Sequence, residues 1–216
     1  MIKSAMKVCE IFLSIQGEST YAGLPCVFIR MSGCNLRCVY CDTAYAYEEG
    51  IEMTEDDLFK QAVSYGISLI EITGGEPLVQ QDVFPLIKRL LDSGLTVLVE
   101  TNGSVSVSRV DRRAIIIMDI KTPGSGMCEA MDFENLRLLK SQDELKFVIA
   151  GRGDYEWSRD FINERGLPGR CTILLSPVFG TLSPGDLARW ILDDRLRARL
   201  NLQLHKYIYG PEERGV

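Results

Sequence analysis

Six short runs of β-branched and aliphatic residues, spread over most of the chain, constrain the fold more than any other feature. Each run has the length of a single strand, and the segments between several of them place apolar residues at helical spacing. Strand and helix therefore alternate, which is typical of a parallel α/β sheet. The expected strands are 25–31, 68–73, 95–100, 114–120, 145–150 and 171–176.

The segments between these strands carry recognisable helix signals. Thr54 and Ser183 are residue types that cap a helix N-terminus, and Gly66, Gly94 and Gly166 are typical stops. No internal repeat, linker or low-complexity run divides the chain, so we expect residues 1–216 to form a single domain. We expect a partial (βα)6 TIM-like barrel with an added N-terminal strand and a C-terminal extension. The helices are expected at 54–66, 79–94, 154–166 and 183–200, and the two added strands at 7–18 and 201–210.

Charge and cysteine content exclude several classes of protein. The formal net charge of -6 argues against a broad nucleic-acid-binding surface. No stretch approaches the roughly 18 apolar residues of a membrane span, and the first residues lack the apolar core of a signal peptide, so we expect a cytoplasmic protein. In a reducing cytosol, seven cysteines indicate metal ligands rather than a disulfide framework. Four isolated cysteines are expected to be small buried hydrophobic residues, namely Cys9, Cys26, Cys128 and Cys171.

The remaining three cysteines form a compact motif in the stretch "SGCNLRCVYCDT". Cys34, Cys38 and Cys41 have the spacing C-x3-C-x2-C, which lets three thiolates of one loop converge on a metal centre. Structural zinc is the alternative, but it requires four ligands, and the one histidine of the chain, His205, is far away in the sequence. An iron-sulfur cubane held by three cysteines leaves one iron open, as catalytic metal sites do.

Unusual residues cluster just after the predicted strands. The stretches "TGGEP", "ETNG", "DIKTPGSG" and "SPVFG" each follow a strand and concentrate glycine with charged or polar residues. In parallel α/β folds the carboxyl ends of the strands carry the active site. The pattern therefore favours an enzyme over a scaffold.

Two of these motifs resemble a known superfamily. "CNLRCVYC" resembles the cluster-binding signature of radical S-adenosylmethionine enzymes, and "TGGEP" resembles their methionine-binding motif. Nearly the whole chain is similar to the 7-carboxy-7-deazaguanine synthase family, through "EIFLSIQGES", "FIRMSGCNLRC", "CDT", "DELKFVI" and "LQLHKYIYGPEERGV". The resemblance implies a radical lyase that converts 6-carboxy-5,6,7,8-tetrahydropterin to 7-carboxy-7-deazaguanine with release of ammonia, on the route to queuosine. It also implies an incomplete barrel, a homodimer, an electron-donor protein of flavodoxin or ferredoxin type, and three cofactors: a 4Fe-4S cluster, S-adenosylmethionine and Mg²⁺.

The resemblance also implies roles for individual residues. Cys34, Cys38 and Cys41 match the cluster ligands that mediate radical generation, and Thr43 matches the magnesium ligand. The positions matching substrate contacts are Ile15, Gln16, Gly17, Glu18, Arg30, Thr73 and His205. The positions matching S-adenosylmethionine contacts are Tyr40, Cys41, Asp42, Gly74, Gly75, Glu76, Asp119, Ile120, Lys121, Ser176, Pro177, Val178 and Phe179.

Three of these residues have alternative interpretations. Arg30 lies in an apolar strand on the face expected to line the barrel lumen, where it can grip a substrate carboxylate; the alternative is an ion pair with a nearby glutamate. Thr43 suits a hard cation, but it can equally cap the turn after Cys41. His205 can contact substrate or be a structural histidine.

Two rival functions share part of this pattern. A glycyl-radical activase has the same cysteine spacing and comparable length, but "SIQGES" near the N-terminus opposes it. An iron-sulfur electron carrier coordinates its cluster fully with cysteines and has no need of "TGGEP". Three clustered ligands therefore favour the radical enzyme.

Overall fold

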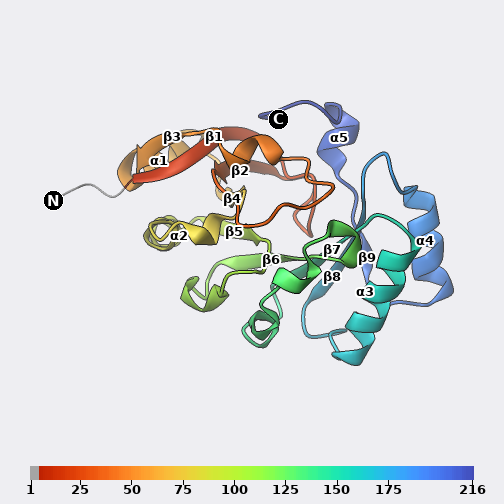
Figure 1. Ribbon diagram of the computed structural model, residues 1–216. Coiled ribbons are helices and arrows are strands. Elements are labelled where there is room, and N and C mark those ends of the chain that lie inside the picture. Colours follow the sequence, from red (N-terminus) through yellow and green to blue (C-terminus); the bar gives the residue numbers. More distant parts are fainter. Residues whose placement is uncertain (1–4) are drawn as a thin grey trace.

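In residues 5–216, which the computed structural model describes, nine strands form one open, curled sheet (Figure 1). The strand order is β3-β1-β2-β4-β5-β6-β7-β8-β9. Neighbouring strands from β2 to β9 are parallel, whereas β1 pairs antiparallel with β2 and β3. The partial TIM-like barrel expected from the sequence is confirmed. The strands are β1 Ala5–Ile15, β2 Pro25–Met31, β3 Ile51–Thr54, β4 Leu69–Gly74, β5 Thr96–Thr101, β6 Ile115–Ile120, β7 Glu144–Ile149, β8 Thr172–Pro177 and β9 Arg199–Leu200.

The six barrel strands and the N-terminal strand lie where the sequence predicts them. Each of the six is within one residue of its expected bounds. The expected helices are also present, although the fourth is much shorter than the predicted 183–200. It ends at Asp193, because Arg195 adopts a left-handed φ of 49° and the N–H of Leu196 turns back to donate to Ile191 O at 3.0 Å. The helices are α1 Glu55–Ser64, α2 Val83–Asp92, α3 Arg152–Glu164, α4 Pro184–Asp193 and α5 Leu204–Ile208.

The strand predicted at 201–210 is wrong, because this segment contains the short helix α5 instead. Its apolar residues suggest a strand, yet its tertiary contacts determine the conformation. The N–H of Leu204 donates to Gly17 O at 2.8 Å, and Gln203 and Lys206 reach the cysteine loop with their side chains. The parallel addition to the sheet is the two-residue strand β9, which precedes this segment.

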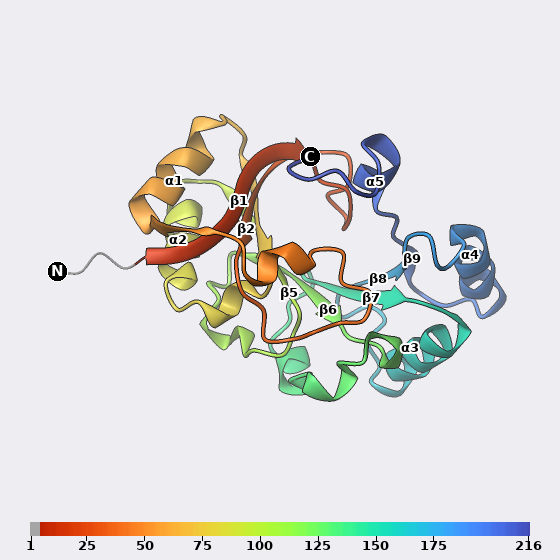
Figure 2. The same cartoon turned by 45° about the horizontal axis from the view of Figure 1, so that its top comes forward.

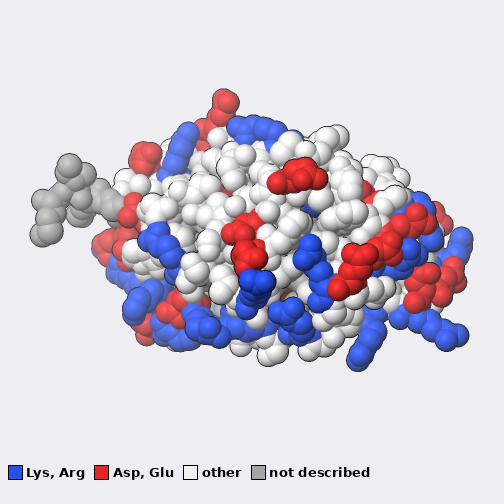
Figure 3. Space-filling model, turned by 60° about the horizontal axis from the view of Figure 1, so that its bottom comes forward, with Lys and Arg blue, Asp and Glu red and all other residues white. Residues whose placement is uncertain are grey.

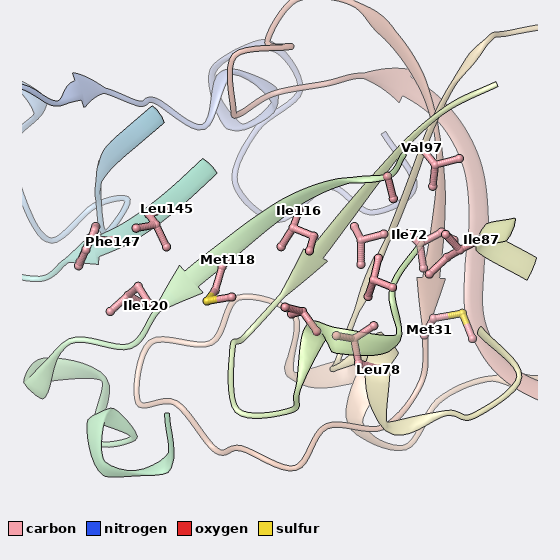
Figure 4. Packing of buried hydrophobic residues seen from close by; sticks show 14 of the residues in the cluster. Met31, Ile72, Leu78, Ile87, Val97, Ile116, Met118, Ile120, Leu145 and Phe147 are labelled. Atoms are coloured by element: carbon pink, nitrogen blue, oxygen red, sulfur yellow. The ribbon is translucent and has the colours of Figure 1, made fainter. Parts of the chain in front are cut away.

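Alternation along the strands separates an apolar outer face from a polar lumen. The outer face packs against the helices as one large core, part of which is seen in Figure 4, with Ile72, Val97, Ile116 and Leu145 among its labelled members. Toward the amino ends of the strands, the lumen is filled by a second apolar cluster, which consists of Cys26, Phe28, Leu69, Leu98, Ile115 and Ile117. The space above this cluster, toward the carboxyl ends of the strands, is lined by charged residues and forms the candidate site.

The face shown in Figure 3 carries mixed charge, and three of the four isolated cysteines are only partly buried. Basic and acidic side chains are intermixed on the face shown in Figure 3, with no extended basic surface there. Within the described residues, no helix has both the length and the apolar character needed to span a bilayer. All seven cysteines lie in the described part of the chain and are free thiols. Of the four expected to be buried, Cys26 is, whereas Cys9, Cys128 and Cys171 are half-buried.

Candidate active site

A pocket of about 300 Å³ lies at the carboxyl ends of the parallel strands. Its walls come from the turn after β1, the ends of the barrel strands, the loop that carries the three cysteines, and the C-terminal segment. Figure 2 shows this cysteine loop in orange, lying across the strand ends. The pocket brings together most of the predicted site residues: Ile15, Gln16, Gly17, Glu18, Arg30, Cys34, Cys38, Tyr40, Cys41, Asp42, Thr43, Thr73, Gly74, Gly75, Asp119, Lys121, Val178, Phe179 and His205.

The three clustered cysteines all line this pocket. Cys34 Sγ accepts from the N–H of Leu36 at 3.4 Å and from Asn102 Nδ2 at 3.7 Å. Within residues 5–216, no group of three His, Cys, Asp or Glu side chains is arranged to hold one metal ion. A cubane differs from a single ion because each thiolate binds a different iron, so its ligands stand further apart. Three free thiols on one pocket wall, with donors aimed at a sulfur, fit such a cluster.

Backbone contacts fix the cysteine loop against the end of β4. The N–H of Glu76 donates to Gly33 O at 2.8 Å, and the N–H of Gly75 donates to Met31 O at 3.0 Å. A Cβ on Gly75 would lie 1.9 Å from Gly33 O, so only glycine allows this approach. Gly74 has a φ of 141°, which also favours glycine. The glycine pair of "TGGEP" therefore positions the cluster loop, in addition to lining the pocket.

Glu76 does not reach the pocket, contrary to its predicted contact with S-adenosylmethionine. Its buried carboxylate accepts from Asn102 N at 2.6 Å, Thr101 Oγ1 at 2.8 Å and Leu78 N at 3.0 Å. These three donors occupy its oxygens and tie the end of β4 to the end of β5. Burial raises the pKa of Glu76, while the three hydrogen bonds act in the opposite direction.

Three other predicted contact residues also lie outside the pocket. Ile120 packs in the outer core, because alternation directs its neighbours Asp119 and Lys121 inward instead. Ser176 Oγ accepts from Asn201 Nδ2 at 2.8 Å and is buried. Pro177 lines a separate, more open hollow beside α4 rather than this pocket. One observation supports the predicted contact at Asp119. Its Oδ1 is buried and has no hydrogen-bond partner among residues 5–216, so it is available to a ligand.

A network of buried charges at the base of the pocket was not predicted from the sequence. Lys146 Nζ donates to Glu18 Oε2 at 3.0 Å, forms an ion pair with Glu100 and lies 3.9 Å from Asp119 Oδ2. Burial opposes ionisation of Glu100, but the Lys146 ammonium outweighs it and lowers the pKa of Glu100. Glu71 is also buried in the lumen, and burial, reinforced by Glu100, raises its pKa well above the usual range.

The turn after β1 is held in one conformation by side-chain contacts. Gln16 Nε2 donates to Glu71, and Gln16 Oε1 accepts from the N–H of Glu18 at 2.6 Å, which fixes the orientation of the amide. His205 packs so closely on Gly17 that a Cβ there would lie 2.2 Å from His205 Nδ1. Burial lowers the pKa of His205, so the imidazole is neutral near pH 7. The predicted substrate turn and the predicted histidine are thus in contact.

Arg30 lines the pocket and also forms the ion pair with a glutamate that was the alternative interpretation, so its contact with a substrate carboxylate stays a prediction. Its Nε donates to Glu10 Oε1 at 2.7 Å. Phe12 lies beneath the guanidinium, with 5.8 Å between the ring centroid and Cζ. The pocket-facing position is the one that strand alternation predicts.

Thr43 also lines the pocket, and its hydroxyl makes no capping hydrogen bond to the following turn, Ala44–Tyr47. The alternative of a capping threonine is therefore not supported by a side-chain contact. Thr43 Oγ1 instead donates to Asp42 Oδ1 at 3.0 Å, and Asp42 Oδ2 accepts from Lys206 and from Gln203 Nε2 at 3.3 Å. The Asp42 carboxylate, predicted to lie at the S-adenosylmethionine site, is thereby engaged by the C-terminal segment.

The C-terminal segment closes one side of the pocket. Gln203 bridges Asp42 and Glu18, with 3.0 Å between Gln203 Nε2 and Glu18 Oε1. Val216 lines the pocket, and the end of the chain lies beside β1 in both ribbon views (Figures 1 and 2). These contacts connect the cysteine loop with the turn after β1.

Comparison with known proteins shows the superfamily and the family to which this chain belongs. Residues 28–189 match the model of the Radical SAM superfamily. A 7-carboxy-7-deazaguanine synthase of Chlorobaculum tepidum is 45% identical over 99% of each chain. The chain belongs to the 7-carboxy-7-deazaguanine synthase family. The family member from Koribacter versatilis is 42% identical over 98% of this chain and 100% of its own.

A solved structure has the same fold as this chain. QueE from Escherichia coli superposes with a TM-score of 0.75 and covers 93% of this chain and 95% of its own, at 23% sequence identity. Membership of the radical S-adenosylmethionine superfamily implies a 4Fe-4S cluster and S-adenosylmethionine as cofactors. Near-complete coverage by synthases favours this family over a glycyl-radical activase or an electron carrier.

Proposed function

We propose that this chain converts 6-carboxy-5,6,7,8-tetrahydropterin to 7-carboxy-7-deazaguanine with release of ammonia, a lyase reaction on the route to queuosine. One observation carries the proposal: a single pocket is lined by the three cysteines, by the polar turn 15–18 and by Arg30, whose guanidinium is suited to binding a carboxylate. A radical enzyme needs its cluster and its substrate within one enclosed space. Family membership supplies the reaction class.

Cys34, Cys38 and Cys41 would hold the cluster, and the strand ends beside them would hold S-adenosylmethionine. When bound, these cofactors supply one-electron chemistry that abstracts a hydrogen atom. Gly75 provides room beside Cys34, while Asp119 offers its unpartnered Oδ1 to a donor group of the ligand. Tyr40 is oriented by its hydroxyl, which donates to Val148 O at 3.2 Å, and burial raises its pKa to about 12.

The opposite wall would bind the pterin. Backbone groups of the turn 15–18 and the carboxylate of Glu18 can read the donor and acceptor edge of the ring. Thr73 also lines the pocket, and its Oγ1 donates to Glu100 Oε2 at 2.9 Å. The guanidinium of Arg30 would bind the carboxylate at position 6 of the pterin.

We also propose that Mg²⁺ binds at Thr43, next to the substrate. A hydroxyl that donates to Asp42 keeps its lone pairs free, and magnesium prefers such oxygen ligands together with water and substrate oxygens. The remaining partners are proposed from the family resemblance: a second copy of the chain in a homodimer and an electron donor of flavodoxin or ferredoxin type. Free thiols suit a cytoplasmic enzyme, since disulfides are rare in that compartment.

The decisive experiment is anaerobic turnover. The reconstituted protein should convert 6-carboxytetrahydropterin, in the presence of S-adenosylmethionine and a reductant, to a product with the mass of 7-carboxy-7-deazaguanine. The variant with Cys34, Cys38 and Cys41 all replaced by Ala should bind no cluster and form no product. The control Cys128→Ala should bind the cluster and form the product. A cluster retained in the triple variant, or absence of the product from an iron-loaded wild type, would refute the proposal.

A further inference from the structure

Glu10 meets Arg30 only because β1 is irregular at Cys9. The register of β1 against β2 shifts by one residue, from Val8 opposite Met31 to Glu10 opposite Arg30. Val8 and Met31 both face the outer apolar core. In a regular strand Glu10 would share the face of Val8, two residues away, so the shift turns Glu10 to the pocket side. Bulges of this kind commonly re-aim a side chain next to an active site.

A single oxygen of Glu10 then joins two parts of the site. Glu10 Oε1 accepts from Arg30 Nε at 2.7 Å and from the hydroxyl of Tyr45 at 2.8 Å. Tyr45 belongs to the cysteine loop, in the turn that follows Thr43. The C-terminal segment encloses this contact, because Arg214 stacks on the Tyr45 ring with Cζ 3.7 Å from the centroid. The carboxylate is therefore held from two directions.

The ion pair leaves the other edge of the guanidinium available. Among residues 5–216, nothing accepts a hydrogen bond from Nη1 or Nη2 of Arg30, although the side chain is only 18% exposed and lines the pocket. A guanidinium held at Nε presents its two terminal amino groups side by side, which is a bidentate arrangement for a carboxylate. Without Glu10, the long side chain could rotate among several rotamers.

We propose that Glu10 and Tyr45 are positioning residues that aim the terminal amino groups of Arg30 at the carboxylate of the substrate. The inference rests on the proposed function, since it deepens the role given there to Arg30. It predicts that Glu10 affects recognition of the carboxylate group and not of the rest of the pterin. It also predicts that Glu10 acts only through Arg30.

Two fluorescent probes, 6-carboxypterin and pterin, test this selectively. Their dissociation constants are measured by fluorescence on the anaerobically reconstituted holoenzyme with S-adenosylmethionine, and their ratio reports the preference for the carboxylate. Glu10→Gln should reduce this preference about tenfold, equivalent to about 1.4 kcal/mol. Tyr45→Phe should reduce it about threefold. The affinity for pterin itself should not change in either variant.

The control is Glu52→Gln, which changes an exposed glutamate of β3 and should leave the preference intact. In an Arg30→Lys background, Glu10→Gln should have no further effect, as a double-mutant cycle requires of residues that act as one unit. An unchanged preference in Glu10→Gln, or an equal loss of affinity for both probes, would overturn the inference. If Glu10→Gln fails to fold, Tyr45→Phe is used for the same test. A wild type that binds both probes equally would overturn the proposed substrate instead.

Discussion

Replacing Gly75 with alanine tests whether the glycine pair positions the cluster loop. The new Cβ would lie 1.9 Å from Gly33 O, 2.5 Å from Gly33 C and 3.0 Å from Cys34 Cβ, whereas ordinary contact begins at 3.4 Å. The backbones of Gly75 and Gly33 must therefore separate until the shortest of these distances reaches ordinary contact. Backbone atoms cannot rotate away as a side chain can, so Gly33 and Cys34 must move together.

The cost of this movement follows from two contributions. Overpacking a filled site costs about 1–3 kcal/mol. Separation also breaks the hydrogen bond from Glu76 N to Gly33 O. A hydrogen bond of this kind contributes about 1 kcal/mol. Gly75→Ala should thus lower the free energy of unfolding by about 2–4 kcal/mol. With a urea m-value of about 2 kcal/mol per molar, the midpoint falls by about 1–2 M.

The assay compares urea denaturation of the cluster-free protein with iron content after reconstitution. Gly75→Ala should lose both stability and iron, because Cys34 is displaced with the backbone. Gly153→Ala is the matched control, since nothing lies within 4 Å of its new Cβ in helix α3. Alanine is favoured over glycine in a helix by up to about 1 kcal/mol, so the control should be no less stable than wild type. If Gly75→Ala keeps the wild-type midpoint and iron content, the close backbone approach does not position the loop.

Two further predictions concern the metal and the buried carboxyl group. Thr43→Ala should lower the turnover rate several-fold and abolish its response to added Mg²⁺, with cluster content unchanged; a wild-type rate that responds to neither Mg²⁺ nor chelator would contradict the site. Because burial raises the pKa of Glu71 well above its usual value of 4.5, the folded state keeps a proton that the unfolded state releases, so wild-type stability falls as pH rises toward the folded-state pKa. Glu71→Gln keeps an acceptor for Gln16 but removes this loss. Its stability relative to wild type should rise by up to about 1.4 kcal/mol per pH unit in that window. Urea titrations at pH 5 and pH 8 measure the difference, and parallel pH dependence of the two proteins would argue against a neutral Glu71.

The barrel strands could be predicted from the sequence because each is a short run of β-branched and aliphatic residues, and alternation within a strand then gives the face of each side chain. The same rule placed Arg30 in the lumen, and applied to Glu71, Glu100 and Lys146 it would have found the charged network, since each interrupts an otherwise apolar strand. Which of these charges pair could not be predicted, because pairing depends on the register between strands that are distant in sequence. Lys146 contacts Glu18 across 128 positions of the chain.

Other features depend on contacts that a single sequence does not encode in any local pattern. Glu76 belongs to a recognised motif, yet its carboxylate caps neighbouring backbone and side-chain donors instead of facing the pocket. The shift at Cys9 breaks the two-residue period and reverses the face of Glu10, which alternation alone would have placed in the core. Helix α5 owes its form to Gly17 and the cysteine loop rather than to its own composition.

The short strands at both margins of the sheet have a consequence for aggregation. An open sheet has two edges, and each could pair with another chain through its free backbone groups. Here the edges are β3, with four residues, and β9, with only two. Glu52 in β3 and Arg199 in β9 place a charge on each edge. The chain thereby keeps the open barrel that its pocket requires while offering little template for intermolecular β-pairing during the slow formation of a parallel sheet.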